Sequence, residues 1–194
     1  IAYDMAHRLR NSFTIMRTLA TRADLEKADA RKTLSRRLSR VRDSHTLAFR
    51  YLFFDVPIQN VIEAAIDDLD RLSRYELDPV SIPADMVEML MLALGELSCS
   101  GGPAELFCLR RGEDRLRVQW REPAPRTDDS LQTGLAEVLI KHLPEQQTGG
   151  TVDIRNDGTG FFWLFDCPLI HPDLAAERTD DEGRAISRNS YVPG

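Results

Sequence analysis

His7, Arg8, Arg10 and Asn11 are the residues of this sequence whose types and spacing could do chemistry. Near neutral pH the imidazole of His7 can offer an unprotonated ring nitrogen, so it can accept a phosphoryl group and present it to a partner. Asn11 follows His7 by four residues and would share its face of a helix. Arg8 and Arg10 could stabilise phosphoryl oxygens, and Asn11 could hydrogen-bond the ring or the phosphoryl group.

A seven-residue apolar repeat surrounds these residues and predicts a helix that reaches to about Glu26. The repeat steps alternately by four and three residues, through Ala2, Ala6, Leu9, Phe13, Met16, Ala20 and Ala23. His7 lies beside this seam, where it is open to solvent. The repeat is already running at Ala2, so we expect the sequence to start inside a helix, with sequence missing upstream.

A second repeat predicts a second helix, with its seam at Leu34, Leu38, Val41, His45, Ala48 and Leu52. A short polar turn over residues 27–30 separates the two helices and predicts an antiparallel hairpin. Because two helices cannot bury a broad core alone, we expect a second copy of the chain to complete a dimeric four-helix bundle. His45 lies on the seam, so it is interpreted as a packed core residue rather than a second phosphoacceptor.

The charge distribution divides the chain near residue 54. Residues 1–54 contain 12 Lys/Arg and 5 Asp/Glu, whereas the remainder contains 13 and 26. We therefore expect a basic helical domain over residues 1–54, an acidic domain over 55–170 and a charged, flexible tail over 171–194.

The second domain alternates helical and strand patterns that predict an α+β layer, with helices on one face of a mostly antiparallel sheet. Predicted helices cover about 57–72, 84–98 and 131–142. A short extended piece covers 80–82, residues 122–130 form a loop, and predicted strands cover about 106–109, 116–120, 151–155 and 161–167.

Composition excludes several other classes of function. The cysteines Cys99, Cys108 and Cys167 and the four histidines lack metal-ligand spacing, so no metal site is expected. We expect the three cysteines to be free thiols, which is typical of a protein in the reducing cytoplasm. No apolar stretch approaches the roughly 20 residues of a membrane helix. The basic run in the second helix lacks interleaved aromatic residues, which argues against a nucleic-acid partner.

The segment His7-Arg8-Leu9-Arg10-Asn11 resembles the His-Arg-x-x-Asn phosphoacceptor box of one branch of sensor histidine kinases, often called HRxxN or HWE-like. The resemblance covers about residues 2–169. Its other parts are Arg40-Val41-Arg42 with His45, the helix from Pro83-Ala84 to Gly95-Glu96-Leu97, Gly134-Leu135, and the last hairpin with Asp157-Gly158-Thr159. It implies a degenerate α/β sandwich of the histidine-kinase ATP-binding type after the hairpin.

Departures from that family lie in its nucleotide boxes. After Glu96, Ser100 stands where the family has the asparagine that holds Mg²⁺ and phosphate, and a serine lacks the amide carbonyl that coordinates a hard cation well. The Asp-x-Gly-x-Gly box, whose aspartate receives the adenine amino group, should follow the strand that ends near Trp120. Residues 121–126 contain no glycine there. The glycine-rich lid is reduced to Thr133-Gly134-Leu135.

These departures imply a histidine phosphotransferase that resembles dimeric phosphotransferases with a degenerate ATP-binding domain. Such a protein carries phosphate on His7 between receiver-domain aspartates, has no cofactor of its own, and depends on the receiver for Mg²⁺. The basic face of residues 1–54 suits acidic receivers. Two alternatives stay open: a divergent but active kinase that phosphorylates His7 from ATP, and a non-enzymatic dimeric scaffold.

Overall fold

The computed structural model describes residues 12–21, 30–100, 102–112, 114–126 and 134–169. A helix over residues 12–21 comes first. It is followed by α2 (Ala30–Arg50), β1 (Val56–Pro57), α3 (Ile58–Ala65), the 3₁₀ turn η1 (Leu69–Arg71), β2 (Leu72–Leu77), β3 (Ser81–Ile82), α4 (Ala84–Leu97), the 3₁₀ turn η2 (Ser98–Ser100), β4 (Ala104–Arg111), β5 (Arg115–Glu122), α5 (Gly134–Glu137), the π-helical turn η4 (Val138–His142), α6 (Leu143–Thr148), β6 (Thr151–Asp157) and β7 (Gly160–Pro168).

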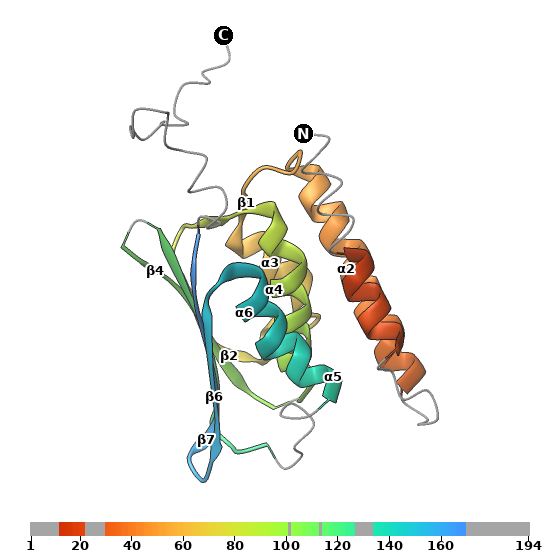
Figure 1. Cartoon of the computed structure of the whole chain (residues 1–194). Helices are drawn as coiled ribbons and strands as arrows, with labels where there is room; N and C mark the ends of the chain where they lie inside the picture. Colours follow the sequence, from red (N-terminus) through yellow and green to blue (C-terminus); the bar gives the residue numbers. More distant parts are fainter. Residues whose placement is uncertain (1–11, 22–29, 101, 113, 127–133, 170–194) are drawn as a thin grey trace.

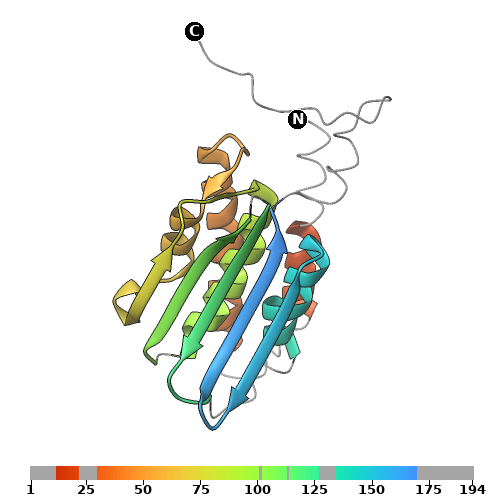
Figure 2. The same cartoon turned by 90° about the vertical axis from the view of Figure 1, so that its left-hand side faces the viewer.

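Five strands form one sheet in the order β2-β4-β5-β7-β6, and only the β2–β4 pair is parallel. Alternate residues of β5 are buried, and Trp120 lies opposite Trp163 of β7. Helices α3, α4 and α6 cover one face, while the described elements leave the other face open (Figures 1 and 2). The predicted α+β layer is therefore confirmed.

Helix α4 is the centre of the core. Twelve of its 14 residues are buried, which is expected for a helix that is apolar on nearly every side. The sheet lies on one side of α4, and α2, α3 and α6 lie on the others (Figure 1). The predicted helix over 84–98 is confirmed, and its C-terminal turn, which carries Glu96, is held inside the molecule.

The two N-terminal helices pack on the rest of their own chain. Ile15 and Leu19 join Val41 of α2 in a buried cluster whose other members are Leu92, Leu135 and Leu139. Ser12 contacts His45 near the C-terminal end of α2, so the two helices run in opposite directions and the predicted hairpin is confirmed for the described residues.

The predicted seam of the first helix lies at the edge of the face that packs within the chain. Phe13 is 65% exposed and Ala20 is exposed, while Met16 is half-buried against the cluster. The buried residues Ser12, Ile15 and Leu19 lie one residue to the side. The reason is that the packing surface comes from α4 and the α5–η4 segment, not from α2 alone. The exposed seam is the surface that a second copy would cover, and the dimer stays a prediction.

A strained connector joins α2 to the sheet layer. The helix ends at Arg50, so Leu52, predicted as a seam residue, lies outside it and is 70% exposed. Leu52 and Phe53 adopt positive φ angles of 52° and 60°, which are uncommon for residues with side chains. Phe53 packs against the main core, and Tyr51 accepts a 2.8 Å hydrogen bond from Asn60.

Two other boundaries differ from prediction. The helix predicted over 57–72 ends at Ala65, because the chain turns through η1, where Leu69 is exposed, and continues as strand β2. The helix predicted over 131–142 continues to Thr148 through the π-helical turn. Within the described ranges, no helix is long and apolar enough to cross a membrane. The division at residue 54 stays a prediction, and the tail lies outside the described residues.

Candidate functional site

The predicted phosphoacceptor His7, with Arg8 and Asn11, lies outside the described residues, so these roles stay predictions. The description begins at Ser12, five residues after His7. The site can therefore be built from what surrounds Ser12 and from the end of α4.

Ser12, His45 and Glu88 form a polar network that joins the first helix, α2 and α4. The Ser12 hydroxyl donates to Glu88 Oε2, and Nε2 of His45 lies 2.8 Å from Ser12 Oγ and 3.6 Å from Glu88 Oε2. This is not the geometry of a nucleophilic triad, because the carboxylate meets the same ring nitrogen as the hydroxyl. The sequence predicted a packed His45; the ring is half-buried and hydrogen-bonded.

The network borders a small cavity of about 30 Å³, which has room for about one water molecule. Three of the described residues that line the cavity each have a buried side-chain oxygen without a hydrogen-bond partner. These oxygens are Asp85 Oδ1, Glu88 Oε1 and Gln147 Oε1. Burial raises the pKa of Glu88 to about 7, against the opposing effect of the Ser12 hydrogen bond. Glu88 is therefore a carboxyl group that changes charge near neutral pH in the folded protein.

The raised pKa of Glu88 makes the stability of the protein depend on pH. The folded state favours the neutral carboxyl, so this stabilisation is complete below about pH 4.5 and is lost as pH rises through about 7. The difference from the ordinary value of 4.5 corresponds to about 3 kcal/mol. We expect Glu88→Gln to gain stability over the wild type by about 2–3 kcal/mol between pH 5 and pH 8 in urea denaturation. A difference between the two proteins that does not change with pH would contradict this.

A bidentate ion pair fastens α2 to the C-terminal turn of α4. Arg37 Nε donates to Glu96 Oε1 at 2.9 Å, and Arg37 Nη2 donates to Glu96 Oε2 at 2.7 Å. The side chains are 11% and 5% exposed. The resemblance places Glu96 in the nucleotide site, and here its carboxylate is paired with Arg37 of the hairpin.

Arg40, one turn further along α2, crosses α4 at Gly95. Its Nε donates to the carbonyl of Ala65 at 3.3 Å, and its Nη2 reaches Asp67 at 3.2 Å. A Cβ on residue 95 would lie 2.1 Å from Arg40 Nε. Gly95 therefore leaves room for the Arg40 side chain to cross α4.

Replacing Gly95 with alanine is expected to lower the free energy of unfolding by about 1–3 kcal/mol. The helix gains about 1 kcal/mol of intrinsic propensity, but the displaced Arg40 loses buried hydrogen bonds. In an Arg40→Ala background the same change should be neutral or stabilising. Urea denaturation of the four proteins of this cycle measures the coupling, and a cost that persists without Arg40 would contradict the mechanism.

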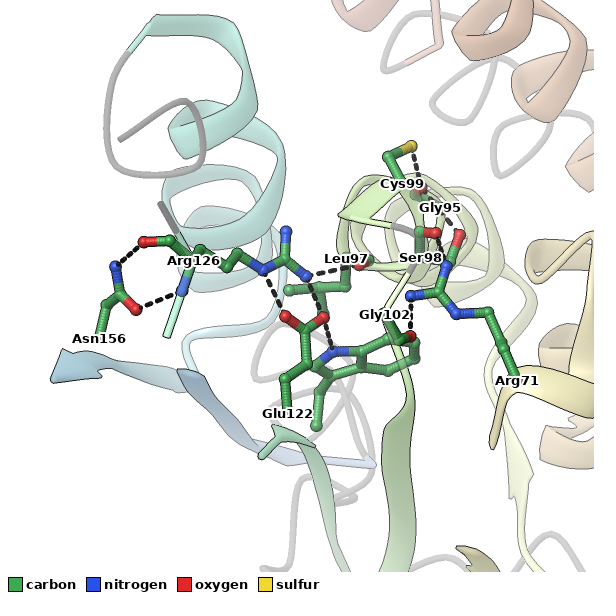
Figure 3. Close-up of polar contacts among 10 residues, drawn as sticks. Arg71, Gly95, Leu97, Ser98, Cys99, Gly102, Glu122, Arg126 and Asn156 are labelled. Atoms are coloured by element: carbon green, nitrogen blue, oxygen red, sulfur yellow. Dashed lines mark hydrogen bonds and ion pairs between the residues drawn. The ribbon is translucent and has the colours of Figure 1, made fainter. Parts of the chain in front are cut away.

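Glu122 and Arg126 fill the corner between the end of β5 and the end of α4 (Figure 3). Arg126 Nε donates to Glu122 Oε2 at 2.9 Å, Arg126 Nη2 donates to Glu122 Oε1, and the same Nη2 donates to the carbonyl of Leu97 at 2.6 Å. Trp120 Nε1 donates to Glu122 Oε1 at 2.9 Å. The side chains of Arg126 and Glu122 are 7% and 6% exposed.

Arg71 holds the other side of the same turn (Figure 3). Its guanidinium donates to the carbonyls of Ser98 and Gly102 and lies 5.8 Å from the centre of the Trp120 ring. A helix C-terminus attracts positive charge, so two arginines stabilise the end of α4. Ser100 ends the 3₁₀ turn η2 at this point.

Cys99 lies in the same turn, and its thiol donates to the Gly95 carbonyl. The residue is exposed, but partial desolvation of the thiol and the nearby charge of Glu96 raise its pKa. The thiol is therefore protonated at neutral pH and is a poor nucleophile.

The two carboxylates of this corner are already paired with arginines. Glu96 binds Arg37 and Glu122 binds Arg126, so neither carboxylate is free to serve as an oxygen ligand for a divalent cation. Gly134, at the predicted lid, has a positive φ of 67° at the start of α5 and is exposed. In the described part of the chain, no cluster of three or more His, Cys, Asp or Glu residues could hold a metal ion.

Sequence reasoning found the helix end and its missing asparagine but missed the arginines that fill it. Arg37 and Arg40 belong to the basic run of the predicted second helix, and Arg126 lies in the predicted loop over 122–130. The signal was available for Arg126, since Glu122 precedes it by four residues and continues the buried alternation of Trp120. Arg37 lies 59 residues from Glu96, and no local pattern predicts their contact.

The sheet and the helices that cover it form a fold of the histidine-kinase ATPase type. The blue-light activated histidine kinase EL346 of Erythrobacter litoralis is similar in structure, with a TM-score of 0.66 at 16% identity over 89% of this chain and 61% of that one. The histidine kinase domain of the same protein gives 0.56 at 16% identity, over 82% and 94% of the two chains.

This chain thus corresponds to 61% of the length of the EL346 kinase. No protein-family model matches the sequence. No curated protein matches it either. The similarity is one of fold.

Proposed function

We propose that this chain is a histidine phosphotransferase of a two-component phosphorelay, which carries phosphate on His7 without binding ATP. The observation that carries the proposal is the Arg126–Glu122 pair, which fills the corner where the resemblance places the nucleotide. The fold shared with the EL346 histidine kinase and the packed helical hairpin support a role in histidine phosphorylation. In this proposal the chain keeps the fold and the helical hairpin that carry the histidine, whereas the residues that would bind a nucleotide are replaced.

The proposed reaction needs only an imidazole and an acidic partner. A neutral ring nitrogen of His7 attacks the phosphorus of a receiver aspartyl phosphate, the bond between phosphorus and the aspartyl oxygen breaks, and the aspartate leaves as a carboxylate. The phosphorylated ring releases its N–H proton to solvent and takes a proton back before the second step. A carboxylate oxygen of the second receiver aspartate then attacks the phosphorus, the N–P bond breaks, and His7 leaves as neutral imidazole. Arg8 and Arg10 stabilise the phosphoryl oxygens, and Asn11 hydrogen-bonds the ring or the phosphoryl group. The receiver supplies Mg²⁺, so the chain itself contributes positioning and charge.

The proposed assembly is a cytoplasmic homodimer that binds response-regulator receiver domains. Residues 1–194 themselves are proposed to bind neither nucleic acid nor membrane. Phe13 and Leu38, 65% and 39% exposed, lie on the predicted seams of the two helices, where a second copy would cover them. The excess of basic residues in 1–54 favours encounter with acidic receivers.

Two other functions make different predictions. A divergent kinase would bind ATP and label its own histidine, and the Ser12–His45–Glu88 network could then hold the acceptor helix against the nucleotide domain. A scaffold would dimerise without exchanging phosphate.

Two incubations of the whole chain separate these functions. In the first, the protein is mixed with a panel of phosphorylated receiver domains; acid-labile phosphate on the protein and faster loss from a receiver are expected. In the second, the protein is incubated with labelled ATP and Mg²⁺, and no incorporation is expected. Strong labelling from ATP would establish the kinase, and no exchange with any receiver would favour the scaffold.

A further inference from the structure

The corner around Arg126 has the features of a receptor for one planar cation. Two parallel donors of the guanidinium meet the two oxygens of Glu122, a third hydrogen bond goes to the Leu97 carbonyl, and the guanidinium carbon lies 4.3 Å from the centre of the Phe161 ring. Asn156 holds the backbone of Arg126 from both sides, at 2.9 Å and 3.0 Å. Carboxylate, carbonyl and ring thus come from three elements, β5, α4 and β7.

The parts of this receptor stay in place without Arg126. Trp120 Nε1 fixes Glu122 Oε1, and both residues belong to the central strand β5, which is paired on both sides. The Leu97 carbonyl belongs to the buried end of α4, and Phe161 is a core residue of β7. The acceptor groups are therefore held in position by the core of the domain.

The geometry selects a guanidinium over other cations. Two parallel N–H···O bonds to one carboxylate and a flat face against an aromatic ring match the planar fork of a guanidinium. An ammonium group is a point charge and cannot make the bidentate contact and stack on the ring together. A nucleotide phosphate would meet the Glu122 carboxylate with like charge.

We infer that this corner is a guanidinium-binding site, which Arg126 occupies in cis and which a small guanidinium ligand or an arginine side chain fills when Arg126 is absent. The inference does not depend on phosphotransfer by His7, because it concerns only the receptor formed by β5, α4 and β7. It assigns a ligand class to the corner where the family resemblance places the nucleotide.

The test is chemical rescue of Arg126→Ala by methylguanidinium. The variant is expected to unfold at a lower temperature than the wild type. Methylguanidinium chloride at up to about 20 mM should raise its melting temperature by roughly 3–5 °C once the ligand reaches about ten times its dissociation constant. Methylammonium chloride and sodium chloride at the same concentrations should not do so, and the wild type should not respond.

Two further variants locate the rescue. Adding Glu122→Gln to Arg126→Ala should abolish the rescue, because the carboxylate is gone. Arg117→Ala, which removes an arginine paired with Asp166 on the open face of the sheet, is a matched control that should not be rescued. If Arg126→Ala does not fold, recovery of its far-UV circular dichroism by methylguanidinium supports the site, and no recovery overturns it.

Other outcomes would also overturn the site. Equal stabilisation by methylammonium would reduce it to a nonspecific cation effect, and stabilisation of Arg126→Ala by ADP would identify a masked nucleotide site instead. ADP that stabilises the wild type would contradict the proposed phosphotransferase but leave the guanidinium site standing, so the two failures can be told apart.

Discussion

Replacing His7 with alanine is expected to abolish the exchange of phosphate with receiver domains. The reaction requires a ring nitrogen that is unprotonated near neutral pH and can form a bond to phosphorus, and alanine offers no such atom. We expect transfer from the best phosphorylated receiver to fall to the rate of spontaneous receiver hydrolysis. Acid-labile phosphate on the protein, followed by gel autoradiography, measures the loss.

His45→Ala is the matched control, because His45 is a second histidine of the same hairpin. Its ring hydrogen-bonds Ser12, five residues from His7, so the variant is expected to slow transfer moderately while keeping the phosphohistidine. Circular dichroism of both variants checks that the fold is intact. If His45→Ala lost all transfer while His7→Ala kept it, the assignment of the phosphoacceptor would be wrong.

The second large effect is expected from Glu96→Ala. The substitution leaves Arg37 charged and buried without its bidentate partner, and breaking such a pair costs about 3–5 kcal/mol. This is a large share of the 5–15 kcal/mol that stabilises a typical domain. Urea denaturation followed by Trp fluorescence should show a much lower midpoint than the wild type.

The double variant Arg37→Met with Glu96→Leu is the informative control. Two apolar side chains of similar size avoid the unpaired charge, so the double variant should recover most of the stability lost in Glu96→Ala. Asp153→Ala breaks an exposed pair with Arg155 and should leave the midpoint almost unchanged. A small cost for Glu96→Ala would show that water reaches Arg37 and that the hairpin is not fixed to α4.

Elements with a regular apolar pattern were predictable from the sequence. Helix α4, the β4–β5 hairpin and the β6–β7 hairpin were found because buried residues recur with the period of their structure. Strand β2 was missed because it is an edge strand in which only Leu72 is buried and the next four residues are exposed. Such a strand forms because β4 pairs with it, and that information lies about 30 residues away.

The sequence predicts which nucleotide-binding residues are missing from the site, but it does not predict which side chains take their place. Ser100 and the missing glycines after Trp120 predict that a nucleotide would lack partners, and this stays a prediction. The side chains that surround the end of α4 are Arg37, Arg71 and Arg126. They come from three separate segments of the chain, so no local pattern predicts that they meet. The first helix shows a similar limit: its heptad pattern predicts a helix, but which face packs depends on Leu92 and Leu139.

The strained backbone at Leu52 and Phe53 determines how motion can pass between the helical hairpin and the sheet. A hinge needs residues that exchange freely between backbone conformations. Leu52 and Phe53 both have positive φ angles, and the region of positive φ that a non-glycine residue can adopt is small. Phe53 packs against the core and Tyr51 accepts a hydrogen bond from Asn60, so both sides of the connector are held to the sheet layer. We expect the connector to be rigid. We therefore expect a partner that binds α2 to shift the hairpin and the sheet layer together rather than to bend the connector between them.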